Sequence, residues 1–159
     1  MSRSPYLTAR RILELDASLS DRERQVIATL RQVRVATAAQ LERLHFADVT
    51  RRQSRKVLAS LKDRRLVARL PRIVGGRRAG SAGYVYTLDV AGLRLTLPAT
   101  SRTVRPWPIG SAFLAHSLDV TALYVRLVDQ ERAGRLVVQA FATEPAAWRT
   151  FYGLSLIHI

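Results

Sequence analysis

Three short motifs in the first third of the chain mark helix starts, and they constrain the fold more than any other feature. In each, a Ser or Thr is followed three residues later by Glu or Gln: Ser20 and Glu23, Thr37 and Gln40, Thr50 and Gln53. In such a capping box, the two side chains satisfy backbone N–H groups of the first helical turn. Apolar residues at helical spacing follow each box, so we predict three consecutive helices that begin at these positions.

The third helix opens the most basic stretch of a chain whose net charge is +14. Residues 51–80 contain eleven Arg or Lys residues and one acid, Asp63. At helical spacing, Val57, Leu58 and Leu61 share a stripe with Ser54, and the charges fall on the other side. Like charge at this density destabilises a folded chain by self-repulsion, and a bound polyanion offsets it. We therefore expect nucleic-acid binding; the alternative is a solvated surface.

A β-hairpin is predicted directly after the basic helix. Residues 66–74 have a strand-like composition, and Pro71 suits only an edge or hairpin position. A Gly-rich tip over residues 75–83 precedes a second strand over residues 84–88, and Asp89 caps a short helix to about residue 97. Three helices followed by a basic-tipped hairpin predict a mainly α fold with a small β wing, the winged helix-turn-helix.

The rest of the chain divides at its proline and glycine residues. Ser111 begins a long amphipathic helix that Gly134 ends near residue 133, and residues 136–141 are predicted to form a strand. We predict a flexible N-terminal arm (1–17), the winged helix-turn-helix (18–97), a Pro-containing linker (98–110), the long helix plus strand as the start of an α/β domain (111–153), and a tail (154–159). Within the arm, the apolar pattern of Ile12, Leu13 and Leu15 leaves a helical turn open.

Side chains near the start of a recognition helix lie closest to base edges in the major groove. We therefore select Arg51, Arg52, Arg55 and Lys56 as DNA-binding residues. Gln53 either reads adenine or closes the capping box, and the sequence leaves both readings open. The remaining candidates lie farther along: Lys62 for phosphate or solvent, and Arg77 and Arg78 at the wing tip for a minor groove or phosphate row.

Several functional classes lack the residues they need. The chain has no cysteine, which excludes disulfides, thiolate metal sites and cysteine nucleophiles. No apolar run is long enough for a membrane span or a signal peptide, so we expect a cytoplasmic protein. His116 and Asp119 are one helical turn apart without further ligands or a nucleophile nearby in the pattern. We expect no cofactor, no metal site and no catalytic residue.

The chain also resembles the replication-relaxation proteins of actinobacterial plasmids and integrated mobile elements. The similarity lies in ATAAQLERLHF (36–46), RRQSRKVLASLKDRRLVARLPRIVGGRRAGSAGYVYTLDVAG (51–92), FLAHSLDVTALYVRLVD (113–129) and EPAAWR (144–149). This resemblance implies an N-terminal winged-helix domain and a part in plasmid replication or conjugative DNA processing. Members continue into an α/β region with acidic residues, so the chain is expected to be C-terminally truncated.

From these observations we expect double-stranded DNA binding in plasmid replication, relaxation or transfer. Two alternatives are a winged-helix transcriptional repressor and the N-terminal part of a nuclease or nicking enzyme whose catalytic region is missing. The apolar face of residues 111–133 is expected to support a homodimer. The final LSLIHI (154–159) matches a translated transposon end used in sequencing libraries, and we expect it to be non-native.

Overall fold

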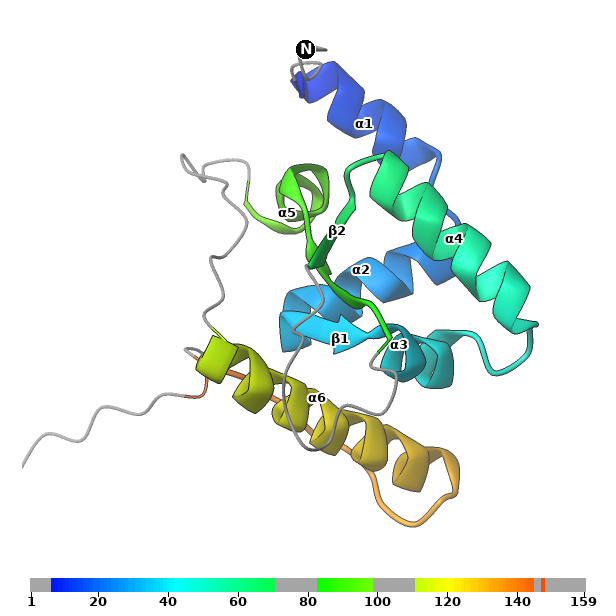
Figure 1. The fold of residues 1–159 in the computed structure, drawn as a ribbon, viewed down its shortest axis with the longest axis vertical. Coiled ribbons are helices and arrows are strands. Elements are labelled where there is room, and N and C mark those ends of the chain that lie inside the picture. The colour runs from blue at the N-terminus through cyan, green and yellow to red at the C-terminus, as the bar shows by residue number, and fades with distance from the viewer. Residues whose placement is uncertain (1–6, 71–82, 99–110, 145–146, 148–159) are drawn as a thin grey trace, which may run out of the picture.

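The computed structural model of the chain describes residues 7–70, 83–98, 111–144 and 147. This part is mostly helical, with a small antiparallel sheet (Figure 1). The elements in chain order are α1 (Ala9–Ala17), α2 (Asp21–Val33), β1 (Val35–Thr37), α3 (Ala38–His45), α4 (Arg51–Asp63), β2 (Val67–Leu70), β3 (Val85–Leu88), α5 (Val90–Thr96) and α6 (Ser111–Arg132).

The three predicted capping boxes are confirmed, and each begins its helix. At α2, the Ser20 hydroxyl accepts from the Glu23 N–H, and the Glu23 carboxylate accepts from the Ser20 N–H over 3.0 Å. Helices α3 and α4 repeat this exchange with Thr37 and Thr50 as the caps. Because capping depends only on residues three positions apart, the sequence alone predicts where these helices begin.

The sheet has the order β1-β3-β2, with β3 in the centre and both pairings antiparallel. Strands β2 and β3 confirm the strand content predicted on either side of the wing tip. The tip itself, from residue 71 to 82, lies outside the described residues. Strand β1 was not predicted: it pairs Val35 with Thr87 and Thr37 with Val85. Three residues directly before a helix have too short a pattern to indicate a strand.

One hydrophobic core joins the helices to this sheet. Its fully buried side chains come from α2, α3, α4 and the start of β2, among them Leu30, Leu41, Leu58, Leu61 and Leu66. Helix α5 closes the core at Gly92, where a Cβ atom would lie 2.1 Å from the Leu66 carbonyl oxygen. Only glycine allows this approach of helix to backbone.

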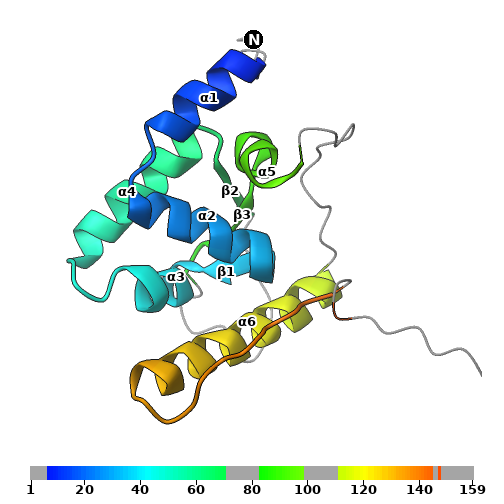
Figure 2. The same cartoon turned by 180° about the vertical axis from the view of Figure 1, so that it is seen from behind.

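The flexible arm expected for residues 1–17 is wrong for residues 9–17, which form helix α1. The Thr8 side chain accepts from the Arg11 N–H at its start, and Leu15 is buried in the core. Figure 2, from behind, shows α1 continuing into α2 at one end of the molecule. The apolar residues Ile12 and Leu15 share a helical face, which is why a short polar segment is held on the core.

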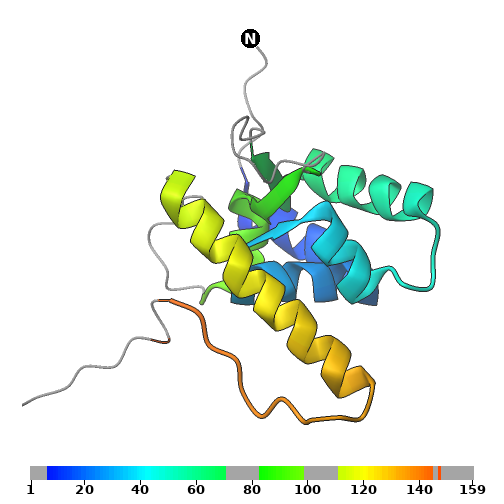
Figure 3. The same cartoon turned by 60° about the horizontal axis from the view of Figure 1, so that its bottom comes forward.

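Helix α6 lies across the opposite end of the molecule, against α2, α3 and β1 (Figure 3). The Thr121 hydroxyl donates to the Val35 carbonyl oxygen over 2.7 Å, so the helix covers the outer edge of β1. The buried stripe is Leu114, Ser117, Thr121 and Val125, which is more polar than the apolar face that we predicted for this helix. Its own chain therefore covers part of the helix that was expected to form a homodimer.

The strand predicted over residues 136–141 is wrong. This segment runs back beside α6 without strand pairing. Phe141 packs on Tyr124 with ring centroids 4.9 Å apart, and the Gln32 side chain donates to the Phe141 carbonyl oxygen over 3.0 Å. Helix α6 already occupies the β1 edge of the sheet. The segment therefore packs through its side chains and through backbone groups that bond to the side chains of Gln32 and Glu131.

The end of α6 is joined to the end of α3. The Arg132 guanidinium donates to the carbonyl oxygens of Arg43 and Leu44 over 3.0 and 2.5 Å, where the last turn of α3 lacks internal donors. His45 lies next to this junction, and its Nε2 is 2.9 Å from the Thr29 hydroxyl. Burial, with repulsion from Arg132 and Arg22, lowers the pKa of His45 from 6.5 to about 4.

This pKa predicts a loss of stability on mild acidification. As the pH falls below 6.5, the unfolded chain protonates at His45 while the folded chain does not, so stability is present above pH 6.5 and is lost toward pH 4. We expect a loss of roughly 1–3 kcal/mol, after allowance for the partial exposure of the ring. Urea unfolding between about pH 7 and 5 measures it. The His45→Gln variant serves as the control, and equal pH dependence in both proteins would contradict the prediction.

Candidate nucleic-acid interface

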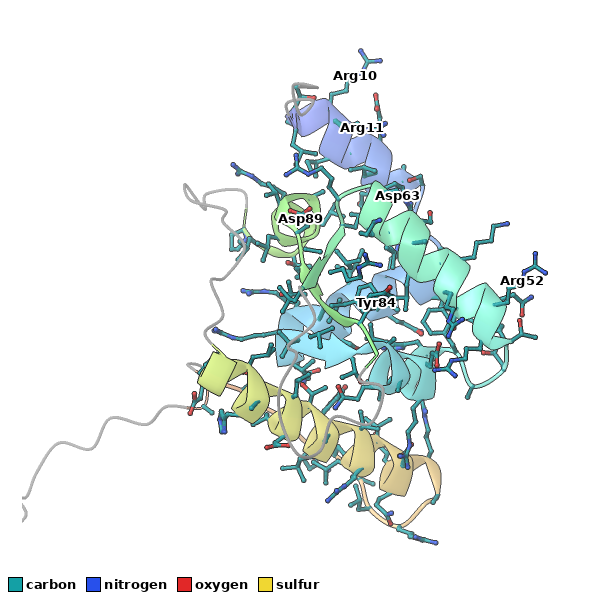
Figure 4. All side chains as sticks on the ribbon, in the orientation of Figure 1. Arg10, Arg11, Arg52, Asp63, Tyr84 and Asp89 are labelled. Atoms are coloured by element: carbon teal, nitrogen blue, oxygen red, sulfur yellow. The ribbon has the colours of Figure 1, made fainter. Side chains whose placement is uncertain are left out.

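Helix α4 buries one side and exposes the other. Ser54, Leu58 and Leu61 are almost completely buried, as the predicted stripe requires. The four selected basic residues, Arg51, Arg52, Arg55 and Lys56, are all exposed. In Figure 4, Arg52 points away from the body of the protein at the N-terminal end of the helix. The hydrophobic contact therefore fixes which side of α4 meets solvent.

Acidic side chains neutralise some of the basic residues in and after α4. Lys62 Nζ lies 3.3 Å from Asp63, and Arg65 Nε lies 3.6 Å from Asp89. Arg64 forms an ion pair with Glu23 of α2, the most buried pair of this group. These three cations are engaged within the fold, so Lys62 is a weaker candidate for DNA than its sequence position suggests.

Four other cations have no acidic partner among the residues that the structure describes. They are Arg52, Arg55 and Lys56 of α4 and Arg69 of β2. Their donors are therefore available to an external anion. Concentrated, unneutralised charge on one exposed surface is the expected footprint of a polyanion-binding site.

Arg51 stands between the paired and the unpaired cations, because it contacts the carboxylate of Glu42 in α3 and still stays exposed. The Ser54 hydroxyl donates to Glu42 Oε1 over 2.8 Å, and Arg51 Nε lies 3.6 Å from Glu42 Oε2. The carboxylate thus links α3 to the first turn of α4. Since the Arg51 side chain is 70% exposed, the contact orients the guanidinium without removing it from solvent.

The turn between α3 and α4 is held from α2. Arg22 Nη2 lies 2.5 Å from Asp48 Oδ2, and this hydrogen bond lowers the pKa of the Asp48 carboxyl. The same guanidinium lies 5.7 Å from the centre of the Phe46 ring, which is buried. These contacts fix the turn, and with it the start of α4.

Sequence reasoning missed a pair of residues on the hairpin. Arg69 was only one of the charges counted in the basic stretch, but its guanidinium carbon lies 3.9 Å from the ring centre of Tyr84. Arg69 pairs with Tyr86 across the strands, so Tyr84 is a diagonal neighbour on the same face. The alternation of the two tyrosines opposite an arginine was the signal in the sequence.

Comparison with family models identifies the family of this chain. The chain matches the family described as replication-relaxation over residues 27–156, which is most of its length. The chain belongs to the replication-relaxation family. This confirms the resemblance stated from the sequence motifs. Searches of curated proteins and of solved structures each found no match to this chain.

The family match contains the exposed cations of α4 and β2 (Arg52, Arg55, Lys56 and Arg69). It begins within α2, includes α3, α4 and both hairpin strands, and continues beyond α6. Helix α1 precedes it. Arg77 and Arg78 fall inside the match but lie outside the described residues, so their predicted roles at the wing tip stay predictions.

No metal-binding cluster is found in the described parts of this replication-relaxation protein. No group of three His, Cys, Asp or Glu side chains there could hold a metal ion. His116 Nε2 lies 4.0 Å from Glu144, and both side chains are substantially exposed, as in a surface contact. Among the described helices, none is long and apolar enough to cross a membrane.

The two readings of Gln53 can be weighed from its contacts. Its side-chain oxygen accepts from the backbone N–H and from the hydroxyl of Thr50, each over 2.9 Å. Reading adenine requires both the oxygen and the nitrogen of the amide, so a bidentate base contact would open the cap. The geometry favours the capping role.

Substitution of Gln53 tests that role. Gln53→Ala removes half of the capping box and should cost about 0.5–1 kcal/mol of stability, whereas Gln53→Glu keeps the box and should cost less. Gln53→Glu also adds negative charge beside Arg52, so it should weaken DNA binding while the fold is preserved. Urea unfolding and duplex titration measure the two effects. An unchanged stability of Gln53→Ala, with altered base preference, would support base reading instead.

Proposed function

We propose that this protein binds double-stranded DNA through a winged helix-turn-helix formed by residues 18–97. The order of elements supports this: α2, β1, α3, α4, and then the β2–β3 hairpin, with a sheet of order β1-β3-β2. In this arrangement α3 and α4 are the helix-turn-helix, and α4 enters the major groove. The hairpin is the wing.

The observation that carries the proposal is the exposed face of α4. Arg52, Arg55 and Lys56 lie in the first two turns of the helix, exposed and without an acid partner in the described part of the chain. The opposite face is fixed on the core by Leu58 and Leu61. A helix held in this way presents its N-terminal side chains to base edges, and its dipole favours nearby phosphate.

Arg51, Lys62, Arg77 and Arg78 have supporting roles in the proposal. Arg51 is oriented by Glu42 and contacts phosphate or a base edge near the start of α4. Lys62, next to Asp63, contacts phosphate at most. Arg77 and Arg78 at the wing tip bind a minor groove or phosphate row, as expected from the Gly-rich sequence around them.

The biological setting follows from the family. Membership suggests a role in replication or relaxation of a plasmid or mobile element, and DNA binding is the step that we assign to these residues. We propose that they bind without catalysing a reaction. Recovering the full reading frame tests the rival nuclease proposal, which requires clustered Asp, Glu and Lys residues downstream. A defined palindromic binding site would favour the repressor.

A homodimer through residues 111–133 has less support than the sequence suggested. The α6 stripe of Leu114, Ser117, Thr121 and Val125 is buried on α2, α3 and β1. Leu123 is the large apolar side chain of α6 that stays about half exposed. One exposed leucine is ordinary for a monomeric surface. The proposed DNA-binding unit is therefore a single copy of the chain.

The proposal predicts a steep and residue-specific dependence of duplex affinity on salt. Each phosphate neutralised contributes about 0.9 log units of affinity per log unit of salt. Replacing Arg52 and Arg55 by Ala should lower the slope by roughly one unit per residue that contacts phosphate. Arg126→Ala, which removes an exposed cation from α6, is the matched control and should leave the slope unchanged. Affinity that is equal at about 50 and 200 mM salt would contradict the proposal.

The proposal predicts that α4 determines the preference among DNA sequences and that the wing contributes affinity for any sequence. Arg52→Ala or Arg55→Ala should reduce the preference among duplex sequences by about 1–3 kcal/mol, as expected for a lost bidentate guanine contact. The Arg77→Ala/Arg78→Ala double variant should weaken all sequences about equally, unless the wing reads groove width. Affinities for a panel of duplexes measure this. If the wing variant alone changes the preference, the two elements have the reverse roles.

A further inference from the structure

A groove of about 540 Å³ lies between α4 and the β2–β3 hairpin. Arg51, Arg55 and Lys62 form its wall on the α4 side, and Arg69 and Tyr84 form the wall on the hairpin side. A double helix is far too wide for a space of this size, which suits a small-molecule-sized group. Only part of a single nucleic-acid strand fits it.

The hairpin wall carries a stacked guanidinium. The Arg69 guanidinium lies over the Tyr84 ring at 3.9 Å, and Tyr84 is 51% exposed (labelled in Figure 4). Stacking uses the face of the guanidinium and leaves the N–H donors at its edge free. No carboxylate takes those donors among the described residues. The guanidinium is therefore held ready for a phosphate, beside an aromatic ring suitable for stacking.

The interior of the groove differs from its basic walls. Between the walls, Ala59 and the mostly buried Tyr86 contribute apolar surface, which suits the face of a base better than a phosphate. Glu42 also lines the groove. Its carboxylate repels a run of phosphates and can accept from an exocyclic amino group of a base. The groove therefore has an apolar and acidic interior between two walls that carry cations. This arrangement is the one expected for a site that binds a base together with its phosphates.

We propose that this groove binds one unpaired nucleotide of a DNA strand. The base stacks on the part of the Tyr84 ring that Arg69 leaves exposed, and its flanking phosphates contact Arg69 and Arg55 across the groove. The inference rests on the proposed DNA binding and adds a DNA structure to it: a strand with an unpaired base, as in a bulge, gap or melted segment, binds better than a fully paired duplex. In fully paired DNA the base is held in the stack and cannot enter the groove.

The test uses the full chain with three fluorescent DNA probes of one sequence: a paired duplex, the same duplex with one bulged nucleotide, and the single strand. The wild type should bind the bulged probe roughly tenfold more tightly than the paired one. Tyr84→Ala should remove this advantage and change paired-duplex affinity by no more than about threefold. Arg69→Ala should weaken binding of the bulged probe more than binding of the paired one, because Arg69 also adds positive charge to the surface that faces a duplex. Tyr84→Phe, which keeps the ring, should retain the advantage.

A second measurement uses the wild-type protein, so it does not depend on whether a variant folds. A 2-aminopurine base placed at the bulge should lose fluorescence on binding to the wild-type protein, because it stacks on an aromatic ring. Arg69→Lys keeps the charge and loses the planar stack, so it should bind the bulged probe less tightly than wild type does.

Each outcome separates the inference from the proposed function. Equal wild-type affinity for paired and bulged probes overturns the inference and leaves duplex binding intact. Equal losses on all probes in Tyr84→Ala and Arg69→Ala also overturn it, and assign the pair to the duplex backbone. Absence of duplex binding at low salt rejects the proposed function. The single-strand probe then still tests the groove. Single-strand binding that depends on Tyr84 supports the nucleotide site, and absence of single-strand binding overturns the nucleotide site.

Discussion

The burial of Leu58 and Leu61 is the contact on which the orientation of α4 depends. A helix of this length is marginal by itself in water, and α4 adds repulsion among its own cations. Each buried leucine contributes about 1.5–3 kcal/mol relative to exposure. The same contact turns Ser54 toward Glu42 and leaves Arg52, Arg55 and Lys56 on the outer side. Packing of the core thus determines what the surface can bind.

The division of the basic residues into two groups could not be predicted from the sequence. Arg64 pairs with Glu23, and Arg43 pairs with Asp129, over long separations along the chain. These pairs exist only after α2, α4, α3 and α6 have packed. The density of positive charge was visible in the sequence. Which of these cations lack an acidic partner in the described part of the chain, Arg69 among them, depends on how the elements pack.

Local signals in the sequence predicted local structure well, and non-local ones were missed. Capping boxes at Ser20, Thr37 and Thr50 placed three helices, because each box is complete within four residues. Strand β1 was missed, since it is defined by its pairing with β3 rather than by its own three residues. Ser117 and Thr121 concealed the buried stripe of α6, because small polar residues can approach a strand edge and bond to it. Residues 136–141 had the composition of a strand, but α6 already lies along the β1 edge of the sheet.

The cover that α6 places on β1 has a consequence for behaviour at high concentration. An open strand edge offers unpaired backbone groups to other chains and is a starting point for aggregation. In this protein a helix lies along that edge, and a threonine hydroxyl bonds to the Val35 carbonyl oxygen. A helix cannot extend a sheet, so it ends the ladder at β1. Strand addition by a neighbouring copy is therefore blocked at β1, one of the two edges of the sheet.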